Sequence, residues 1–409
     1  MQLDTNFVRA QFPQNHWRWA FFENAGGAFV PYSVIQRMTE YMTENQVQPG
    51  YPAGPSTQAK QRMDAGHHLM AEMIGAAPEE VTVSASTSIN AYVLAQALRP
   101  LWQAGDEILV SNLNHEANSG PWRRLQEFGL KIVDWPVTAD AGLDMAALPA
   151  LLNERTRLLA FPHVSNITGE INDVPGITQM AHDKGALVCV DGVAAAPHRA
   201  VEARKWDVDF YLFSFYKVFG PHLGCLYGKR EHLLKARGQY HYFFPEDDLL
   251  HKLNPAGPNH ESIAALVGIS DYFDTLALHH GLEITDKFER TRQLYQLFVE
   301  HEELLARRFV DWATDRERVK LIGPATGTRD VRVPTFSLLL DGVQSADAAK
   351  QAAEQGVAVG FGHFYAKRLL ESIGIADLQN GVLRCSMAHY NTVEEVDKLT
   401  AALDTILRK

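Results

Sequence analysis

Short apolar runs alternate with longer amphipathic segments over most of this sequence, and the alternation leaves few folds open. Five of the runs read as buried strands, namely VTVS from position 81, EILVS from 107, RLLAFPHV from 157, ALVCVD from 186 and VDFYLFS from 208. Strands that alternate with helices are typical of βαβ units, which build a mainly parallel sheet with helices on both faces. The sequence therefore predicts an α/β fold.

Two of the helices between these strands have recognisable ends. Ser56 is placed to cap a helix that ends at Gly75. Pro175 is placed to open a second helix, which ends at Gly185. We therefore expect helices over about residues 56–75 and 175–185.

The last part of the chain departs from the alternation. Residues 283–314 predict one long amphipathic helix that leads into a smaller C-terminal domain. Thr392 and Glu395 form a capping box, which opens the last helix. The aromatic, acidic and Pro/Gly-rich segment 238–260 breaks the periodicity, so we expect a long loop with a functional or interface role.

Charge and composition exclude several classes of partner. The chain has 409 residues, of which 46% are hydrophobic, so it can bury the cores of two or three domain-sized units. Its net charge is −11 and neither end carries a basic run, which argues against nucleic acid and favours a small charged metabolite. No apolar run approaches membrane-spanning length, and the N-terminal segment lacks the apolar core of a signal peptide. We expect a soluble cytoplasmic protein.

The three cysteines are expected to be structural. Cys189, Cys225 and Cys385 lie far apart, without CxxC spacing, which argues against a disulfide framework and a cysteine-rich metal site. Each falls in a predicted buried strand, where a thiol is more often a small core residue than a nucleophile. We therefore expect neither a metal nor thiol chemistry.

One lysine, Lys217, stands between two apolar and aromatic runs in the stretch YLFSFYKVFGPHLGCLYG, residues 211–228. It follows a predicted strand, and dry surroundings disfavour the charged form of an amine, which can then form a Schiff base with an aldehyde. For an isolated lysine, the commoner arrangement is a side chain that reaches from a strand end to water. The neighbouring motifs favour the reactive amine.

Asp191 supplies the first of these motifs. It ends the predicted strand in ALVCVDGVAAAPH, at the sheet edge where open α/β folds bind ligands, although an aspartate at such a place also serves as a helix cap. A Schiff-base lysine with a carboxylate that faces a pyridinium nitrogen is the pair that pyridoxal 5′-phosphate needs, because the carboxylate keeps the ring nitrogen protonated. Lys217 and Asp191 therefore predict a pyridoxal phosphate site.

Two further segments supply what this cofactor needs. The stretch SASTSINAYVLAQAL places Ser86 and Thr87 between a strand and a helix, where hydroxyl and N–H groups can hold a phosphate, although such residues also cap helices in general. His115, in SNLNHEANSGPW, follows the next strand, where a flat imidazole can lie against the cofactor ring. No second ligand stands at helical spacing from His115, which argues against a metal site.

Together these stretches resemble the class V aminotransferase superfamily, specifically its cysteine desulfurase-like branch, over nearly the whole chain. NHEANSGPW is similar to that branch's histidine loop, HVSNITGEIND to its asparagine loop, VCVDGVAAAPH to its aspartate strand, FSFYKVFGPHLGCLYG to its lysine segment, and GVLRCSMAHYNTVEEVD to its C-terminal arginine segment. The five motifs stand in the family's order. The resemblance implies the pyridoxal phosphate-dependent transferase fold type I, with a large domain built on a mainly parallel seven-stranded sheet sandwiched by helices, and a small α+β C-terminal domain.

The resemblance also implies an organisation of the chain. Residues 1–22 would pack on the small domain, residues 23–285 would form the large cofactor-binding domain, and residues 286–409 the small domain. It implies a homodimer with its active sites at the subunit boundary, and the 238–260 loop is our candidate for a cross-subunit contribution.

Individual roles follow from the same resemblance. Lys217 would carry the cofactor and remove a proton from the substrate, Asp191 would face the pyridinium nitrogen, and His115 would stack on the ring. The other expected cofactor contacts are Ala85, Ser86, Thr87, Asn166, Ala194, Ser214 and Tyr216, with Asn166 on the phenolic oxygen and Ser86, Thr87 and Ser214 on the phosphate. Arg384 would clamp the substrate carboxylate, a task that suits a planar guanidinium at a strand end. The expected substrate site also includes Gly26, Gly27, His363 and Tyr365, the last two as proton donors or packing residues.

Several positions depart from the family pattern. Tyr365 stands where cysteine desulfurases carry a mobile-loop cysteine, so the sulfur acceptor is absent. Gly360 replaces an arginine that is common among desulfurases, Ala194 a glutamine at the cofactor, Tyr216 a histidine at the phosphate, and Pro258 a threonine that commonly reaches the partner subunit's site. These departures are compatible with cofactor binding and argue against persulfide chemistry.

The reaction is predicted only as a class. Removal of the Cα proton of a small amino acid by Lys217 is common to transamination, epimerisation and β-elimination, and the sequence does not choose among them. A second candidate is a cysteine desulfurase or selenocysteine lyase that works without the loop cysteine. A third, of another class, is a degenerate pyridoxal phosphate-binding regulatory protein, against which the intact set of Lys217, Asp191, His115 and Arg384 argues.

Overall fold

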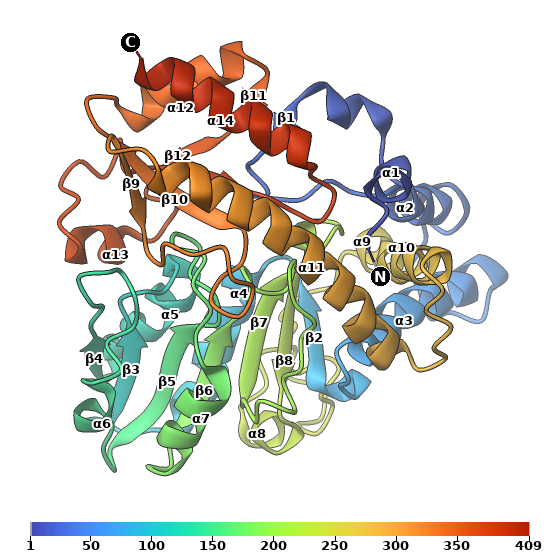
Figure 1. The fold of residues 1–409 in the computed structure, drawn as a ribbon. Coiled ribbons are helices and arrows are strands. Elements are labelled where there is room, and N and C mark those ends of the chain that lie inside the picture. The colour runs from blue at the N-terminus through green and yellow to red at the C-terminus, as the bar shows by residue number, and fades with distance from the viewer. Residues whose placement is uncertain (1, 409) are drawn as a thin grey trace.

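The computed structural model describes residues 2–408, and its centre is a seven-stranded sheet (Figure 1). The strands are β2 (Val81–Ser84), β3 (Glu107–Ser111), β4 (Lys131–Trp135), β5 (Thr156–Pro162), β6 (Leu187–Asp191), β7 (Phe210–Ser214) and β8 (Gly224–Gly228). They lie in the order β2, β8, β7, β6, β5, β3, β4, and β8 alone runs antiparallel to its neighbours. The predicted mainly parallel sheet is confirmed.

Both faces of this sheet are buried, because successive side chains of a strand point to opposite sides. In β3, Leu109 joins one hydrophobic core, whereas Ile108 and Val110 join another. The helices of the first core include α3 (Gly54–Met73), α7 (Val174–His182) and α10 (Val267–His279), and those of the second include α4 (Thr87–Leu98), α5 (Gly120–Arg123) and α8 (Arg230–Lys235). This double burial explains why the strands read as continuous apolar runs.

A smaller unit follows the long helix α11 (Lys287–Thr314). Its four-stranded antiparallel sheet has the order β12, β13, β10, β9 and packs with helices around a core of its own. The elements are β9 (Val319–Ile322), β10 (Thr335–Leu340), α12 (Ser345–Glu354), β12 (Gly360–Gly362), α13 (Lys367–Ser372), β13 (Val382–Ser386) and α14 (Val393–Leu407). The implied α+β C-terminal unit is therefore present.

Helix α11 links the two units. It begins at Lys287, because Asp286 caps it by accepting a hydrogen bond from the backbone N–H of Glu289 at 2.7 Å. The predicted start at residue 283 is therefore four residues too early, whereas the predicted end is confirmed. In Figure 1 the helix runs from beside α10 to the strands β9 and β10.

The N-terminal segment contacts both units. It contains α1 (Thr5–Ala10) and β1 (Ala20–Phe21), and is followed by α2 (Tyr32–Glu44). Strand β1 pairs with the short strand β11 (Val357–Ala358), and Arg9 forms a 2.9 Å ion pair with Glu395 of α14. Asp4 donates its backbone N–H to His280 at 3.0 Å, beside the end of α10. The domain bounds given above stay a prediction.

Besides the start of α11, one predicted helix end is wrong, the cap at Ser56. Helix α3 begins at Gly54, so Ser56 lies inside its first turn and donates instead to the carbonyl of Gln48 at 2.6 Å. The prediction is wrong because a serine hydroxyl can satisfy the backbone of the preceding loop as well as that of a helix. Gly75 ends this helix with a φ of +65°, as expected.

The remaining elements also follow the predictions. Pro175 lies in the first turn of α7, and Thr392 and Glu395 exchange both hydrogen bonds of the capping box. The short helices α6 (Leu148–Leu151) and α9 (His260–Ala265) complete the fold, and the chain between α8 and α9, which holds the 238–260 loop, contains no strand or helix. Within residues 2–408, no helix combines the length and the apolar character that a membrane crossing needs.

Candidate active site

The predicted residues converge at the carboxyl ends of the parallel strands. Strands β3 and β5 are neighbours, but the chain leaves them toward opposite edges of the sheet, which creates the crevice where α/β folds bind ligands. Residues at or just after the carboxyl ends of β2, β3, β5, β6 and β7 line one cavity there. They include Ser86, Thr87, His115, Asn166, Asp191, Ala194, Ser214, Tyr216 and Lys217.

Lys217 is buried in a short turn directly after β7, and 8% of its surface is exposed. Burial, followed by the charge of Arg384, lowers its pKa to about 8, although two nearby carboxylates oppose the shift. A pKa near 8 leaves about one tenth of the amine uncharged at pH 7, far more than in an exposed lysine. The amine is therefore suited to act as a nucleophile and a base.

Asp191 is the buried last residue of β6. Its Oδ1 accepts a hydrogen bond from the backbone N–H of Val193 at 2.9 Å. Burial raises the pKa of this carboxyl, and that hydrogen bond and the Lys217 charge oppose the rise. A buried carboxylate is stabilised by a cation, so the position suits a protonated ring nitrogen.

His115 follows β3 and is held as a neutral ring. Its Nδ1 accepts the backbone N–H of Ala117 at 3.1 Å, which assigns the ring proton to Nε2. Burial, together with the charges of Lys217 and Arg384, lowers its pKa to about 3. A neutral imidazole can lie against a positively charged ring without repelling it.

Hydroxyl groups surround the start of helix α4. Ser86 caps the helix by accepting the N–H of Ile89 at 3.2 Å, and the Thr87 and Ser214 hydroxyl oxygens lie 2.6 Å apart. Gly224 of β8 allows this closeness, because a Cβ there would stand 2.3 Å from the Thr87 nitrogen. Strand β8 therefore packs directly against the turn that contains Ser86 and Thr87.

This donor set fits pyridoxal 5′-phosphate, the group that the resemblance implies. The start of α4 and its hydroxyls can hold the phosphate. Burial raises the pKa of the Tyr216 phenol, so this residue stays protonated and can donate to a phosphate oxygen. Asp191 can face the ring nitrogen while Lys217 reaches the aldehyde.

Arg384 brings the small unit to the site. It lies in β13, and its Nη1 donates to the backbone carbonyl of Asn166 at 3.2 Å. Its guanidinium carbon lies 3.7 Å from the centre of the Phe364 ring. Its buried Nε has no hydrogen-bond partner among the described residues. Arg384 therefore retains N–H groups for a carboxylate between the two units.

Sequence reasoning missed Glu23. Its Oε1 accepts a hydrogen bond from Arg384 Nη2 at 2.8 Å, across 361 residues of chain. A Cβ at Gly26 would stand 2.2 Å from the carboxylate of Glu23, so Gly26 makes room for that acid. Gly27 lies against the Tyr216 ring, where a Cβ would be 3.5 Å away. The one feature of the local sequence that could have indicated Glu23 is its place three residues before the paired glycines Gly26 and Gly27, in FFENAGG.

The segment around Tyr365 is fixed on the histidine loop. The backbone carbonyl of Tyr365 accepts the N–H of Glu116 at 2.9 Å, and Arg368 forms an ion pair with the Glu116 side chain. The Tyr365 ring centre lies 5.3 Å from that of His115, and 67% of the residue is exposed. Phe364 and Tyr365 both have positive φ, a strained conformation that often marks a functional site.

Some predicted residues lie outside the cavity that contains Lys217. The residues absent from its lining are Ala85, Gly26, Gly27, His363, Tyr365 and Arg384. Ala85 is exposed on the turn before α4, and His363 Nδ1 accepts the backbone N–H of Tyr365 at 3.1 Å. Arg384 remains coupled to the cavity through its charge on Lys217 and His115.

The cysteines are buried in strands, as predicted. Cys189, Cys225 and Cys385 lie in β6, β8 and β13 and are free thiols. Burial raises the pKa of each thiol, which removes the thiolate needed for attack.

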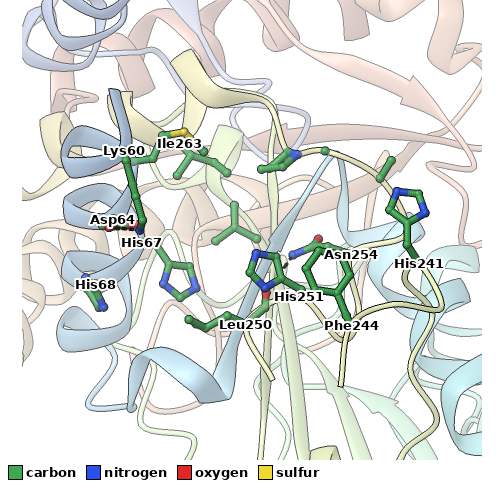
Figure 2. Close-up of a pocket in the computed structure, with 15 residues that line it drawn as sticks. Lys60, Asp64, His67, His68, His241, Phe244, Leu250, His251, Asn254 and Ile263 are labelled. Atoms are coloured by element: carbon green, nitrogen blue, oxygen red, sulfur yellow. Dashed lines mark hydrogen bonds and ion pairs between the residues drawn. The ribbon is translucent and has the colours of Figure 1, made fainter. Parts of the chain in front are cut away.

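A second cavity, of about 330 Å³, lies between α3 and the 238–260 loop (Figure 2). Lys60 and His67 of α3 stand on one side, and Phe244 and His251 of the loop on the other. None of the predicted cofactor or substrate residues lines it. Of these two cavities in the described part of the chain, the first is the one that combines a buried lysine, a buried carboxylate and hydroxyl groups, so we place the chemistry there.

Known proteins share the sequence pattern and the fold of this chain. The family model described as Aminotransferase class-V matches residues 20–399. The chain is 36% identical to the aminotransferase-like protein FGM3 of Gibberella zeae over 98% of each chain. It is 31% identical to the cysteine desulfurase-like protein ustD of Aspergillus flavus, over 100% of this chain and 91% of that protein. The crystal structure of the cysteine desulfurase CsdA of Escherichia coli superposes with a TM-score of 0.82 at 26% identity, covering 100% of this chain and 99% of that one.

Proposed function

Since this chain belongs to the aminotransferase class-V family, we propose that it is an enzyme that removes the Cα proton of a small amino acid through Lys217. Its cofactor is pyridoxal 5′-phosphate, which the residues of the cavity fit. The observation that carries the proposal is the buried Lys217 amine, with its lowered pKa, in one cavity with Asp191. A family member with only a structural role would not need a buried amine whose pKa is lowered toward neutral pH.

Each residue has a chemical task in this proposal. Bound pyridoxal phosphate supplies an aldehyde that condenses with amines and a protonated ring that withdraws electron density from Cα. With the cofactor bound, Asp191 would keep the ring nitrogen protonated, and His115 would lie on the ring and exclude water. Lys217 Nζ takes the Cα proton and can return it. Arg384 holds the α-carboxylate through its remaining N–H groups.

The candidate reactions differ in what happens to the substrate after its Cα proton is removed. Transamination, β-elimination and epimerisation all begin with the same proton transfer and differ in where the next proton goes or which group leaves. Tyr365, beside His115, is our candidate for the donor of a second proton. A desulfurase without a loop cysteine is the second candidate, since relatives carry that name, but the buried thiols of this chain disfavour a persulfide.

An amino-acid screen tests the proposal. We expect purified, cofactor-loaded protein to change its visible absorbance with at least one small amino acid and to exchange that substrate's Cα hydrogen for solvent deuterium, detected by mass spectrometry of the products. Sulfide and alanine from L-cysteine at a catalytically useful rate would favour the desulfurase. No absorbance change and no exchange across all proteinogenic amino acids would favour the regulatory protein.

The pH dependence of cofactor loading follows from the pKa of Lys217. Condensation with an aldehyde needs the uncharged amine, whose fraction rises as the pH passes through about 8. We expect the rate of cofactor attachment to cofactor-free protein to rise about tenfold between pH 7 and pH 8.5 and then to level off. Borohydride trapping at timed intervals measures this rate. Nα-acetyl-lysine, measured in parallel, corrects for titration of the cofactor itself. A midpoint of the protein's pH profile near 10.5, the ordinary pKa of a lysine amine, would contradict the prediction.

Two further properties are part of the proposal. A homodimer is supported by the 238–260 loop, where Tyr242 is 98% and Phe243 66% exposed, since aromatic side chains of this kind are enriched at interfaces. A cytoplasmic location is supported by three free cysteines, which are typical of a reducing compartment.

A further inference from the structure

Glu23 lies beside Arg384, the residue proposed to bind the carboxylate of the substrate. Its carboxylate lies 2.8 Å from Arg384 Nη2, and it forms the only ion pair that Arg384 makes among the described residues. Arg384 is 3% exposed and the Glu23 side chain 29%, so water reaches the pair only from the side of the carboxylate. The field of Glu23 also reaches Lys217, where it favours the charged amine. Glu23 is therefore an anion within the electrostatic range of the reacting centre.

Two glycines leave the space that the Glu23 carboxylate fills, and we call this space its seat. A Cβ at Gly26 would stand 2.2 Å from Glu23 Oε2, and a Cβ at Gly360 would stand 2.4 Å from Glu23 Oε1. A side chain at either position would collide with this carboxylate, which would then have to move from its place beside Arg384. Gly360 of β12 pairs with Arg384 in the small-domain sheet, so the seat is built around the guanidinium itself.

The backbone around Glu23 is fixed to the end of β13. Ser386 donates its N–H to the carbonyl of Phe22 at 2.7 Å, and the Ser386 hydroxyl accepts the N–H of Ala25 at 2.8 Å. Asn24 donates its side-chain amide to the carbonyl of Ser386, also at 2.8 Å. The chain on both sides of Glu23 is thus held to the strand that carries Arg384, so the acid and the guanidinium keep their spacing.

Arg384 can bind a substrate carboxylate while Glu23 stays in place. A guanidinium has five N–H groups, and the described contacts use one for Asn166 and one for Glu23. The Nε–H and one hydrogen on each terminal nitrogen remain. The one positive charge of Arg384 would then face two carboxylates.

We propose that Glu23 determines the charge selectivity of the site, so that it accepts amino acids with neutral or positively charged side chains and rejects those with acidic side chains. The inference rests on the proposed function, because it needs Arg384 to bind the substrate α-carboxylate. An acidic side chain would place a third carboxylate near a single guanidinium in poorly solvated surroundings. A neutral isostere of the same shape meets no such repulsion.

The test compares the isosteric pair L-aspartate and L-asparagine. Dissociation constants are measured by absorbance titration of the cofactor-loaded protein, a binding measurement that does not depend on turnover. We expect the wild type to bind L-asparagine at least about tenfold more tightly than L-aspartate. Glu23→Gln keeps the size of the side chain and removes its charge, so it should bring this ratio close to one, chiefly by tightening L-aspartate.

Two further variants make the test decisive. Gly360→Ala leaves Glu23 charged but displaces it from Arg384, and it should also reduce the ratio. Glu371→Gln, on the exposed face of α13, makes the same change of charge away from Arg384 and should leave the ratio as in the wild type. If Glu23→Gln fails to load the cofactor, the Gly360→Ala ratio alone decides.

The outcomes separate this inference from the proposed function. Binding of both amino acids by the wild type with equal affinity, or an unchanged ratio in both Glu23→Gln and Gly360→Ala, overturns the role of Glu23 and leaves the proposed function standing. No absorbance change with any amino acid overturns both.

Discussion

The variant Lys217→Arg is expected to lose about 10⁴-fold in kcat while it keeps its fold. Arginine preserves the positive charge and most of the length, but its guanidinium does not lose its proton, so it cannot accept one from Cα. It also cannot condense with the cofactor aldehyde. The measurement is deuterium exchange at Cα of whichever amino acid the screen identifies, followed by mass spectrometry.

The protein contains its own control for the attachment site. Lys252 is another buried lysine, but its ammonium donates to the backbone carbonyls of Leu234 and Glu246 and lies outside the cavity. After borohydride treatment of the loaded wild type, we expect the added cofactor mass on the peptide that contains Lys217 and none on the peptide that contains Lys252. Attachment elsewhere, or full exchange activity in Lys217→Arg, would remove the basis of the proposed function.

The variant Asp191→Asn is expected to lower kcat about 10³-fold with little change in the amount of bound cofactor. A neutral amide has nearly the same shape but cannot stabilise a positive charge on the ring nitrogen. The ring then withdraws less electron density, and Cα releases its proton more slowly. Measured at saturating amino acid and corrected for cofactor content, the loss should appear in kcat rather than in KM.

Asp209→Asn is the matched control for this change. Asp209 is also a buried aspartate of the sheet, but it directly precedes β7, at the opposite end of that strand from the site. Although burial opposes the shift, hydrogen bonds from His182 and His232 hold the pKa of its carboxyl below the usual range. Its replacement should lower the melting temperature and leave kcat unchanged. A kcat loss equal to that of Asp191→Asn would show that burial, and not position at the ring, explains the effect.

The residues that could be predicted from the sequence share one property. Lys217, Asp191 and His115 each lie at or just after the end of a recognisable strand, and the carboxyl ends of parallel strands meet at one edge of a sheet. Their convergence therefore needed no knowledge of tertiary contacts. The layered fold was predictable for the same reason, because doubly buried strands leave continuous apolar runs.

Residues whose role depends on distant contacts were not predictable. The partner of Glu23 lies 361 positions away, and no periodicity relates an acid near the N-terminus to a strand near the C-terminus. Gly360 was noted as a missing arginine, but the sequence did not show that an acid fills the vacated space. Ser56 was misassigned because a hydroxyl has several backbone groups within reach, and the choice among them is made by the preceding loop.

The division of labour between Lys217 and Arg384 has a consequence for how this protein can change. The amine belongs to the central sheet and Arg384 to the C-terminal sheet, while α11 packs against α3 and α10 of one unit and against β9 and α14 of the other. A small tilt of that helix resizes the gap that an amino acid must bridge, and misplacement by a single ångström is enough to slow chemistry about a hundredfold. New preferences for substrate size can thus evolve through packing residues on α11 that no substrate ever meets.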